Sequence, residues 1–269
     1  MKDQAIEVAK TETTDHARRN RLREYLQHAL LRQLFERDLL EDLIFHGGTA
    51  LRVIHGLARF SEDLDFHLSR PDQKYSAGAY LDDLRKDLQR SGYRVVLKPR
   101  LEGNVQSCMF GFERLLYECD LSPHENQKLN IRLEIDVNPP QGFRFERALI
   151  NTYFPFVVLH HDKPSFMAGK LHAILQRRFP KGRDFYDVLF YLGRWKAVSP
   201  NIPYLNNALK QTGYRGNAVA EHNWKKVTAL RVRAVDWVQI QKDIEPFLLR
   251  PEDLKAFRKE FLLQLLEEN

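Results

Sequence analysis

The sequence is poor in cysteine and has no long hydrophobic run. Only two cysteines, Cys108 and Cys119, occur among 269 residues, which excludes a small disulfide-stabilised scaffold, and no Cys/His cluster has zinc-site spacing. No apolar stretch reaches the length that crosses a bilayer, so we expect no transmembrane helix. The polar N-terminus lacks the apolar core of a signal peptide. These absences predict a cytoplasmic protein with reduced cysteines and no membrane partner.

Composition and charge are those of an ordinary globular protein with a mild basic excess. The 269 residues are 43% hydrophobic and 29% charged, which suffices for a sizeable core. Lysine and arginine number 42 against 36 acidic residues, and the net charge of +6 has the sign that favours a phosphate-rich partner. The excess alone does not identify that partner, because many basic proteins bind no nucleic acid.

Residue periodicity indicates an α+β chain. A helical pattern runs from Asp15 to Leu43, after polar residues 1–15 that we expect to be poorly ordered. Strand-like segments cover 93–98, 106–112 and 129–137, and helical patterns dominate from Pro164 onward. We therefore predict a mixed sheet with helices, including an N-terminal helix, in residues 1–160 and a mostly helical domain in residues 161–269.

Residues 45–66, FHGGTALRVIHGLARFSEDLDF, hold the densest group of candidate functional residues. A glycine–glycine–threonine turn at 47–49 precedes a helical segment, and its backbone amides can face a phosphate. Asp63 and Asp65 are two apart at the start of a strand, so their carboxylates point to the same face and repel unless a cation or a proton lies between them. Taken alone, the glycine turn could be a helix cap, and the two aspartates could lie at a solvated strand end. The combination of both features favours nucleotide chemistry.

This stretch resembles the start of the DNA polymerase β-like nucleotidyltransferases, and GGTAL followed by RFSEDLDF is similar to the AbiEii/AbiGii toxin branch. The resemblance implies a polymerase β-like core in which Asp63 and Asp65 are catalytic and bind Mg²⁺ or Mn²⁺. It also implies that the phosphates of an NTP substrate are held by the glycine turn and the following loop. The residues concerned are Gly47, Gly48, Thr49, Arg59 and Ser61.

A third carboxylate is expected on the strand at 131–137. Its apolar and polar residues alternate, so Arg132, Glu134 and Asp136 share one face. The resemblance implies that this strand supplies a further catalytic, metal-binding acid, and the Asn-Pro turn that follows favours Asp136 over Glu134. The alternative is the solvated face of an antiparallel strand.

A second part of the resemblance lies in residues 163–191. It implies that Lys170 is catalytic and contacts the nucleotide's phosphates, and that Asp184 and Asp187 are paired acids, of which the essential one is left open. Alternatively, Lys170 lies beside an apolar helical stripe and Asp184 caps a helix that begins at Phe185. The basic residues of this segment are predicted to bind RNA, with a solvated surface as the alternative. They are Arg177, Arg178, Lys181 and Arg183.

The resemblance as a whole implies a toxin-type nucleotidyltransferase. Such an enzyme transfers a nucleoside monophosphate from an NTP to an RNA acceptor, here the 3′ end of tRNA, which blocks translation, and it has a cognate antitoxin. One alternative keeps the enzyme but moves the nucleotide to a protein hydroxyl, as in AMPylation. Another is a non-catalytic module that binds RNA or nucleotides. Acceptor assays on tRNA and on protein distinguish these alternatives.

Overall fold

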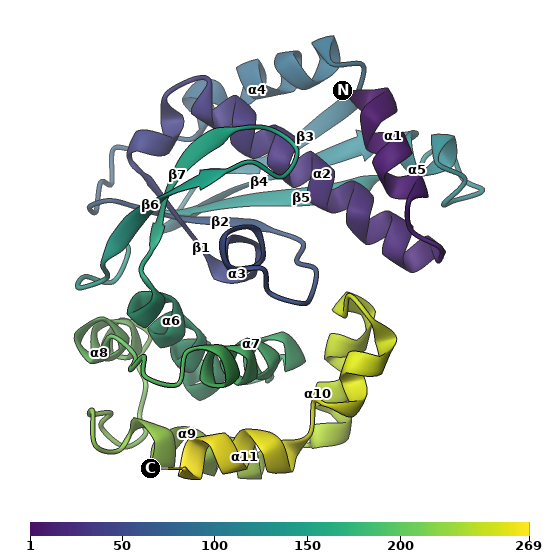
Figure 1. Ribbon diagram of the computed structural model, residues 1–269. Coiled ribbons are helices and arrows are strands. Elements are labelled where there is room, and N and C mark those ends of the chain that lie inside the picture. Colours follow the sequence, from purple (N-terminus) through teal and green to yellow (C-terminus); the bar gives the residue numbers. More distant parts are fainter. Residues whose placement is uncertain (269) are drawn as a thin grey trace. The chain divides into compact units, whose positions relative to one another are not determined.

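The computed structural model describes residues 1–268, which divide into two compact units (Figure 1). Unit 1 contains Met1–Gly56, Phe60–Pro139 and Arg147–His160. Unit 2 contains Leu57–Arg59, Pro140–Glu146 and the residues from His161 onward. Two short segments from residues 1–160 thus belong to unit 2, and one of them carries Arg59.

Seven strands of residues 1–268 form one mixed sheet in the order β3-β4-β5-β2-β1-β7-β6. Their bounds are Leu43–His46 for β1, Leu64–Leu68 for β2, Arg94–Arg100 for β3, Val105–Glu113 for β4, Leu129–Asp136 for β5, Phe145–Ile150 for β6 and Phe156–His161 for β7. Strand β2 is parallel to β5 and β1 is parallel to β7, whereas β1–β2, β3–β4 and β4–β5 are antiparallel.

The other elements of unit 1 are helices, some of which pack against this sheet. They are α1 (Lys2–Lys10), α2 (Asp15–Phe35), the 3-10 turn η1 (Leu39–Glu41), α3 (Gly47–His55), α4 (Gly78–Arg90) and α5 (Leu115–Glu118). Helix α2 packs against β5 and α4 against β3. On β5, Ile131 and Leu133 are buried whereas Arg132 is exposed. The strand predicted at 129–137 and its alternation are therefore confirmed.

The expectation that residues 1–15 are poorly ordered is wrong. Helix α1 packs against α2, and its Ala5 and Ala9 are both 0% exposed. Residues four apart lie on one face of a helix, and the small alanines allow close approach to the neighbouring helix. The Tyr25 hydroxyl donates to Gln4 Oε1 at 2.8 Å, which further ties α1 to α2.

Unit 2 is helical apart from short segments. Its elements are α6 (Lys163–Gln176), α7 (Gly182–Arg194), α8 (Ile202–Gln211), α9 (Trp224–Ala234), α10 (Trp237–Ile244), η2 (Glu245–Phe247), η3 (Pro251–Lys255) and α11 (Lys259–Glu267). The Asp162 side chain caps α6 by accepting from Ser165 N at 2.9 Å. The predicted α+β fold, with helices dominating from about residue 164, is confirmed. Within residues 1–268 no helix is both long and apolar enough to cross a bilayer.

The two cysteines are unpaired and buried. Burial raises the pKa of both the Cys108 and the Cys119 thiol to about 11. Because the thiolate is the reactive form, we expect a thiol-specific reagent at pH 8 to label the native protein at least roughly 100-fold more slowly than the guanidinium-unfolded chain. Absorbance of the released chromophore measures both rates. Rapid labelling of two thiols in the native protein would contradict the buried placement.

Candidate active site

The glycine turn and the strand that carries Asp65 are built directly against each other in unit 1. Strand β1 ends at His46, which lies opposite Asp65 on β2, and α3 begins at Gly47 with φ of +76°. A Cβ atom added to Gly47 would overlap Asp65 Oδ2 and lie 3.0 Å from Asp65 Cγ. Glycine is therefore required by both backbone and space, and it brings the positive N-terminal end of α3 beside a carboxylate.

Two further residues that were predicted to bind phosphates, Thr49 and Ser61, form hydrogen bonds that connect neighbouring segments of unit 1. Thr49 is 1% exposed, and its hydroxyl donates to the carbonyl oxygen of Asp63, which ties α3 to the start of β2. The carbonyl oxygen of Ser61 accepts from Gln27 Nε2 at 3.1 Å. Asp63 and Asp65 are both half-buried. The site thus has two partly exposed carboxylates, and that of Asp65 lies against the glycine turn. The contact of Thr49 and Ser61 with phosphates stays a prediction.

The register of β2 and β5 brings Glu134, rather than Asp136, next to Asp65. In this parallel pair Asp65 lies opposite Glu134 and His67 lies opposite Asp136. Asp136 Oδ1 accepts from the amide of Asn138 at 2.9 Å, and burial raises the pKa of Asp136. The sequence favoured Asp136 as the third acid, whereas the register places Glu134 opposite Asp65. The role of Asp136 as a third metal ligand stays a prediction that this register does not favour.

Arg132 lies on the same sheet face as these acids. It donates to Glu134 Oε1 at 3.2 Å. This hydrogen bond raises the pKa of Arg132 against the opposing effect of burial, and the charges of Asp63 and Asp65 act in the same direction as the hydrogen bond. The four charged groups therefore form one electrostatic cluster on the exposed face of the sheet.

The donor set fits a divalent cation held partly by substrate. Within the described part of the chain, no group of three or more His, Cys, Asp or Glu side chains is arranged to hold a metal ion. Mg²⁺ is nevertheless commonly bound by one or two carboxylates plus substrate phosphates and water. Asp63 and Asp65, with oxygen donors beside a glycine turn, meet that requirement. They are the residues that would hold the cation.

Helix α2 fixes the position of α3 through a buried ion pair that the motif analysis missed. Glu24 on α2 forms an ion pair with Arg52 on α3, and a second one with Arg21 at 2.7 Å. Arg52 also lies over the ring of Phe60, 4.2 Å from its centroid. Burial opposes ionisation of Glu24, but Arg52 and Arg21 outweigh it and lower the pKa of Glu24. No local pattern could have identified this pairing, because its partners lie on separate helices.

In unit 2, Asp187 is the centre of a buried ion network. Its carboxylate accepts two hydrogen bonds from Arg59, both at 2.6 Å, and forms an ion pair with Lys170 Nζ at 2.8 Å. The side chains of Arg59 and Asp187 are 2% and 0% exposed. Burial opposes ionisation of Asp187, but Arg59 and Lys170 outweigh it and lower its pKa. The bidentate, charge-assisted pairing with Arg59 fixes the carboxylate of Asp187. That carboxylate in turn holds Lys170.

Arg59 was predicted to contact phosphates, and its placement favours a structural role instead. It belongs to the segment Leu57–Arg59 of unit 2, where it forms a β-bridge with Leu248. Its guanidinium is buried and forms an ion pair with Asp187. A contact with phosphates therefore stays a prediction without support from this geometry.

The alternative interpretation of Asp184 as a helix cap is wrong. Helix α7 begins at Gly182, so Asp184 lies within its first turn and its amide bonds to the carbonyl of Lys181. The carboxylate of Asp184 faces Lys170 Nζ at 3.4 Å and forms an ion pair with Arg177 Nε at 3.3 Å. Asp184 Oδ2 is buried and accepts no hydrogen bond within residues 1–268. Asp184 is thus held less tightly than Asp187.

Some of the basic residues in the segment 177–183 contact other residues of unit 2, and others are exposed to solvent. Arg177 is paired with Asp184, and Arg183 lies over the ring of Phe247 at 4.3 Å. Arg178 and Lys181 are exposed. RNA binding by these residues stays a prediction, and the exposed pair is its better-placed part.

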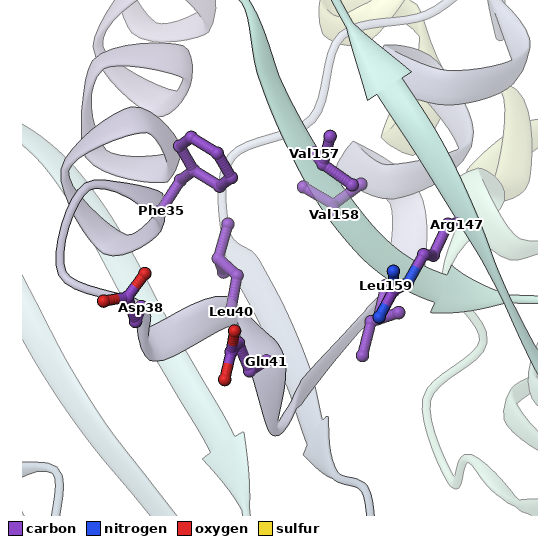
Figure 2. Close-up of a pocket in the computed structure, with 8 residues that line it drawn as sticks. All are labelled: Phe35, Asp38, Leu40, Glu41, Arg147, Val157, Val158 and Leu159. Carbon is purple, nitrogen blue, oxygen red and sulfur yellow. The ribbon is translucent and has the colours of Figure 1, made fainter.

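A cavity of about 230 Å³ in unit 1 is separate from these groups. Figure 2 shows its apolar wall, which includes Phe35, Leu40 and Val158, with the carboxylates of Asp38 and Glu41 at one side. None of the residues predicted to bind nucleotide, metal or RNA lines it. The candidate chemistry therefore lies on the sheet face and around Lys170, outside this cavity.

The sequence matches a protein family described as "Nucleotidyl transferase AbiEii toxin, Type IV TA system" over residues 28–267. No curated protein matches it. Matching solved structures include a proposed nucleotidyltransferase from H. pylori, with TM-score 0.47, 16% identity and coverage of 89% of this chain and 91% of that chain. JHP933 from Helicobacter pylori gives TM-score 0.46, 17% identity and 90% and 88% coverage. An antigenic nucleotidyltransferase-like protein from Paracoccidioides brasiliensis gives TM-score 0.43, 18% identity and 70% and 85% coverage.

Proposed function

Because the chain belongs to the AbiEii family of nucleotidyltransferase toxins of type IV toxin–antitoxin systems, we propose that it transfers a nucleoside monophosphate from an NTP to the 3′ end of tRNA. Nucleotidyltransferases of this kind use an NTP and a divalent metal, and a type IV toxin implies an antitoxin. A modified 3′ end cannot accept an amino acid, so translation stops. We take Mg²⁺ or Mn²⁺ as the cation.

The observation that carries the proposal is the contact between the glycine turn and Asp65. A helix N-terminus with free amides favours the phosphates of the NTP, and Asp63 and Asp65 would hold the cation beside them. When bound, the cation neutralises charge on the phosphates. The hydroxyl oxygen of the acceptor forms a bond to the α-phosphorus of the NTP. The bond from that phosphorus to the oxygen that bridges to the β-phosphorus breaks, so pyrophosphate leaves. The hydroxyl proton passes to solvent.

Lys170 is proposed to contact phosphates, with Asp187 and Arg59 as positioning residues. An ammonium that is fixed by a buried carboxylate loses little further entropy when it binds an anion. Asp184, which is held by longer contacts of 3.3 and 3.4 Å, is the acid that we propose to influence activity directly. The net charge of +6 and the exposed Arg178 and Lys181 support an RNA acceptor.

The test is transfer of label from each α-³²P-NTP to total tRNA or to total cell protein, with Mg²⁺ or Mn²⁺ present. Asp65→Asn gives the background, and Asp83→Asn on the surface of α4 is the matched control. We expect label on tRNA from the wild type and from Asp83→Asn. Label on protein instead would replace RNA by a protein acceptor. No label with any NTP, while the protein still binds RNA, would reduce the function to binding.

A further inference from the structure

One face of the outer strands β3, β4 and β5 is open and carries a group of cations. We call Lys98, Arg100 and Arg132 on this face the cationic sheet face. All three residues are exposed. The register connects them to the carboxylates of the site, because residues directly opposite each other on paired strands have side chains on the same face.

Two rows of paired residues make this connection. In the first, Asp65 lies opposite Glu134, Glu134 opposite Ser107, and Ser107 opposite Arg100. In the second, Arg132 lies opposite Met109, and Met109 opposite Lys98. Neighbouring strands are about 4.8 Å apart, so the first row runs roughly 14 Å from Asp65 to Arg100. The cations thus extend away from Asp65 along a single surface.

The opposite face of the same strands is the core of unit 1. Val95, Cys108, Phe110 and Ile131 point to it and are buried, and helices α2 and α4 pack there. The alternation of buried and exposed residues along each strand therefore separates a covered face from an open one. The open face is therefore not part of the core of unit 1.

The charges of this face are available to a ligand. Lys98 and Arg100 form no ion pair within residues 1–268. The side chain of Arg132 is 46% exposed, and its partner Glu134 lies between Asp65 and Ser107 in the first row. The rows thus carry two unpaired cations, Lys98 and Arg100, on β3 and acids on β2 and β5. The surface becomes more positive with distance from the candidate metal site. A polyanion that ends at the metal site complements this gradient.

We propose that the cationic sheet face binds the phosphates of the single-stranded 3′ end of the RNA acceptor, with Lys98 and Arg100 on the backbone and the terminal hydroxyl toward Asp63 and Asp65. This inference rests on the proposed function for its choice of RNA. An exposed sheet face suits an unpaired strand, because single-stranded RNA presents its phosphates and bases to an open surface. The half-buried Met109 between Lys98 and Arg132 adds an apolar contact for a base.

Fluorescence anisotropy with a short labelled single-stranded oligoribonucleotide, measured with the full chain over a range of salt, tests the proposal. The test variant is Lys98→Gln/Arg100→Gln. The matched control is Lys86→Gln/Arg90→Gln on α4, which removes the same charge from the covered side and alters side chains that are 55% and 74% exposed. We expect the test variant to raise Kd about tenfold at low salt and to reduce the salt slope by about 0.7 for each phosphate that the protein no longer neutralises.

The control should keep the wild-type Kd and slope, and Lys98→Arg/Arg100→Lys should restore both. Equal Kd and slope in the test variant and the wild type would overturn the proposal, as would an equally weakened control, or a wild type that binds no RNA. Label transfer from NTP is measured in parallel. If the wild type labels tRNA and the KM for RNA is unchanged in the test variant, the sheet face is excluded while the transferase stands. If no RNA is labelled, the proposed function fails and anisotropy alone decides the binding surface.

Discussion

Replacement of Asp187 by alanine is expected to lower the free energy of unfolding by about 3–5 kcal/mol, because it leaves Arg59 buried without its counter-ion. Arg59 is 2% exposed and both of its hydrogen bonds to Asp187 are 2.6 Å long. Lys170, the third member of the network, has Asp184 as a second partner and is partly exposed. Guanidinium-induced unfolding at pH 7, followed by circular dichroism, measures the change.

The same network predicts a loss of stability in acid. Its neighbouring cations lower the pKa of Asp187 in the folded protein below the unfolded value of about 3.9. A depressed folded pKa gives a contribution that is present above the unfolded pKa and is lost as pH falls through the folded pKa. The difference in stability between the wild type and Asp187→Ala should therefore be constant near neutrality and shrink below about pH 4.

Two further variants make this prediction specific. Asp184→Asn should destabilise much less than Asp187→Ala, because Asp184 makes only contacts of 3.3 and 3.4 Å. Arg59→Met/Asp187→Leu removes both charges and should be more stable than Asp187→Ala, since no unpaired ion remains. If Asp187→Ala unfolds at the wild-type denaturant concentration, the network does not stabilise unit 2 and the proposed positioning of Lys170 fails with it.

Local patterns sufficed for the secondary structure around the motifs. Asp63 and Asp65 were placed at the start of a predicted strand, and β2 spans Leu64–Leu68. The alternation at 131–137 predicted a strand with one buried face, and β5 has that burial. The prediction for residues 131–137 used the side-chain period of a single segment, which depends on backbone geometry alone.

Relations between segments could not be predicted in this way. Which residue of β5 lies opposite Asp65 depends on the register of β2 against β5, and the sequence of a single strand does not contain that register. Arg59 and Asp187 are 128 residues apart, so their pairing depends on the tertiary fold. Helix α1, in residues that were expected to be poorly ordered, was missed because its buried residues are alanines, which hydrophobic periodicity weights only weakly.

Replacement of Gly47 by alanine is expected to lower kcat for nucleotidyl transfer at least about 100-fold, because a displacement of a reacting group by about 1 Å can have that effect. The added Cβ would overlap Asp65 Oδ2 and approach Asp65 Cγ to 3.0 Å, so either the carboxylate or the glycine turn must move. The positive φ of +76° adds backbone strain of about 1 kcal/mol. Steady-state transfer assays and denaturation curves measure the two effects separately.

Gly56 at the other end of α3 provides the matched control. Its φ is +69°, and a Cβ there would meet nothing within 4 Å. Gly56→Ala therefore introduces the same kind of strain without the overlap, and it should lose about 1 kcal/mol of stability while retaining kcat. If both variants lose activity equally, strain in α3 explains the loss and the contact with Asp65 is unimportant. If Gly47→Ala alone is inactive although it folds, the space that glycine leaves beside Asp65 is required for the reaction, as expected where a phosphate and a cation share that space.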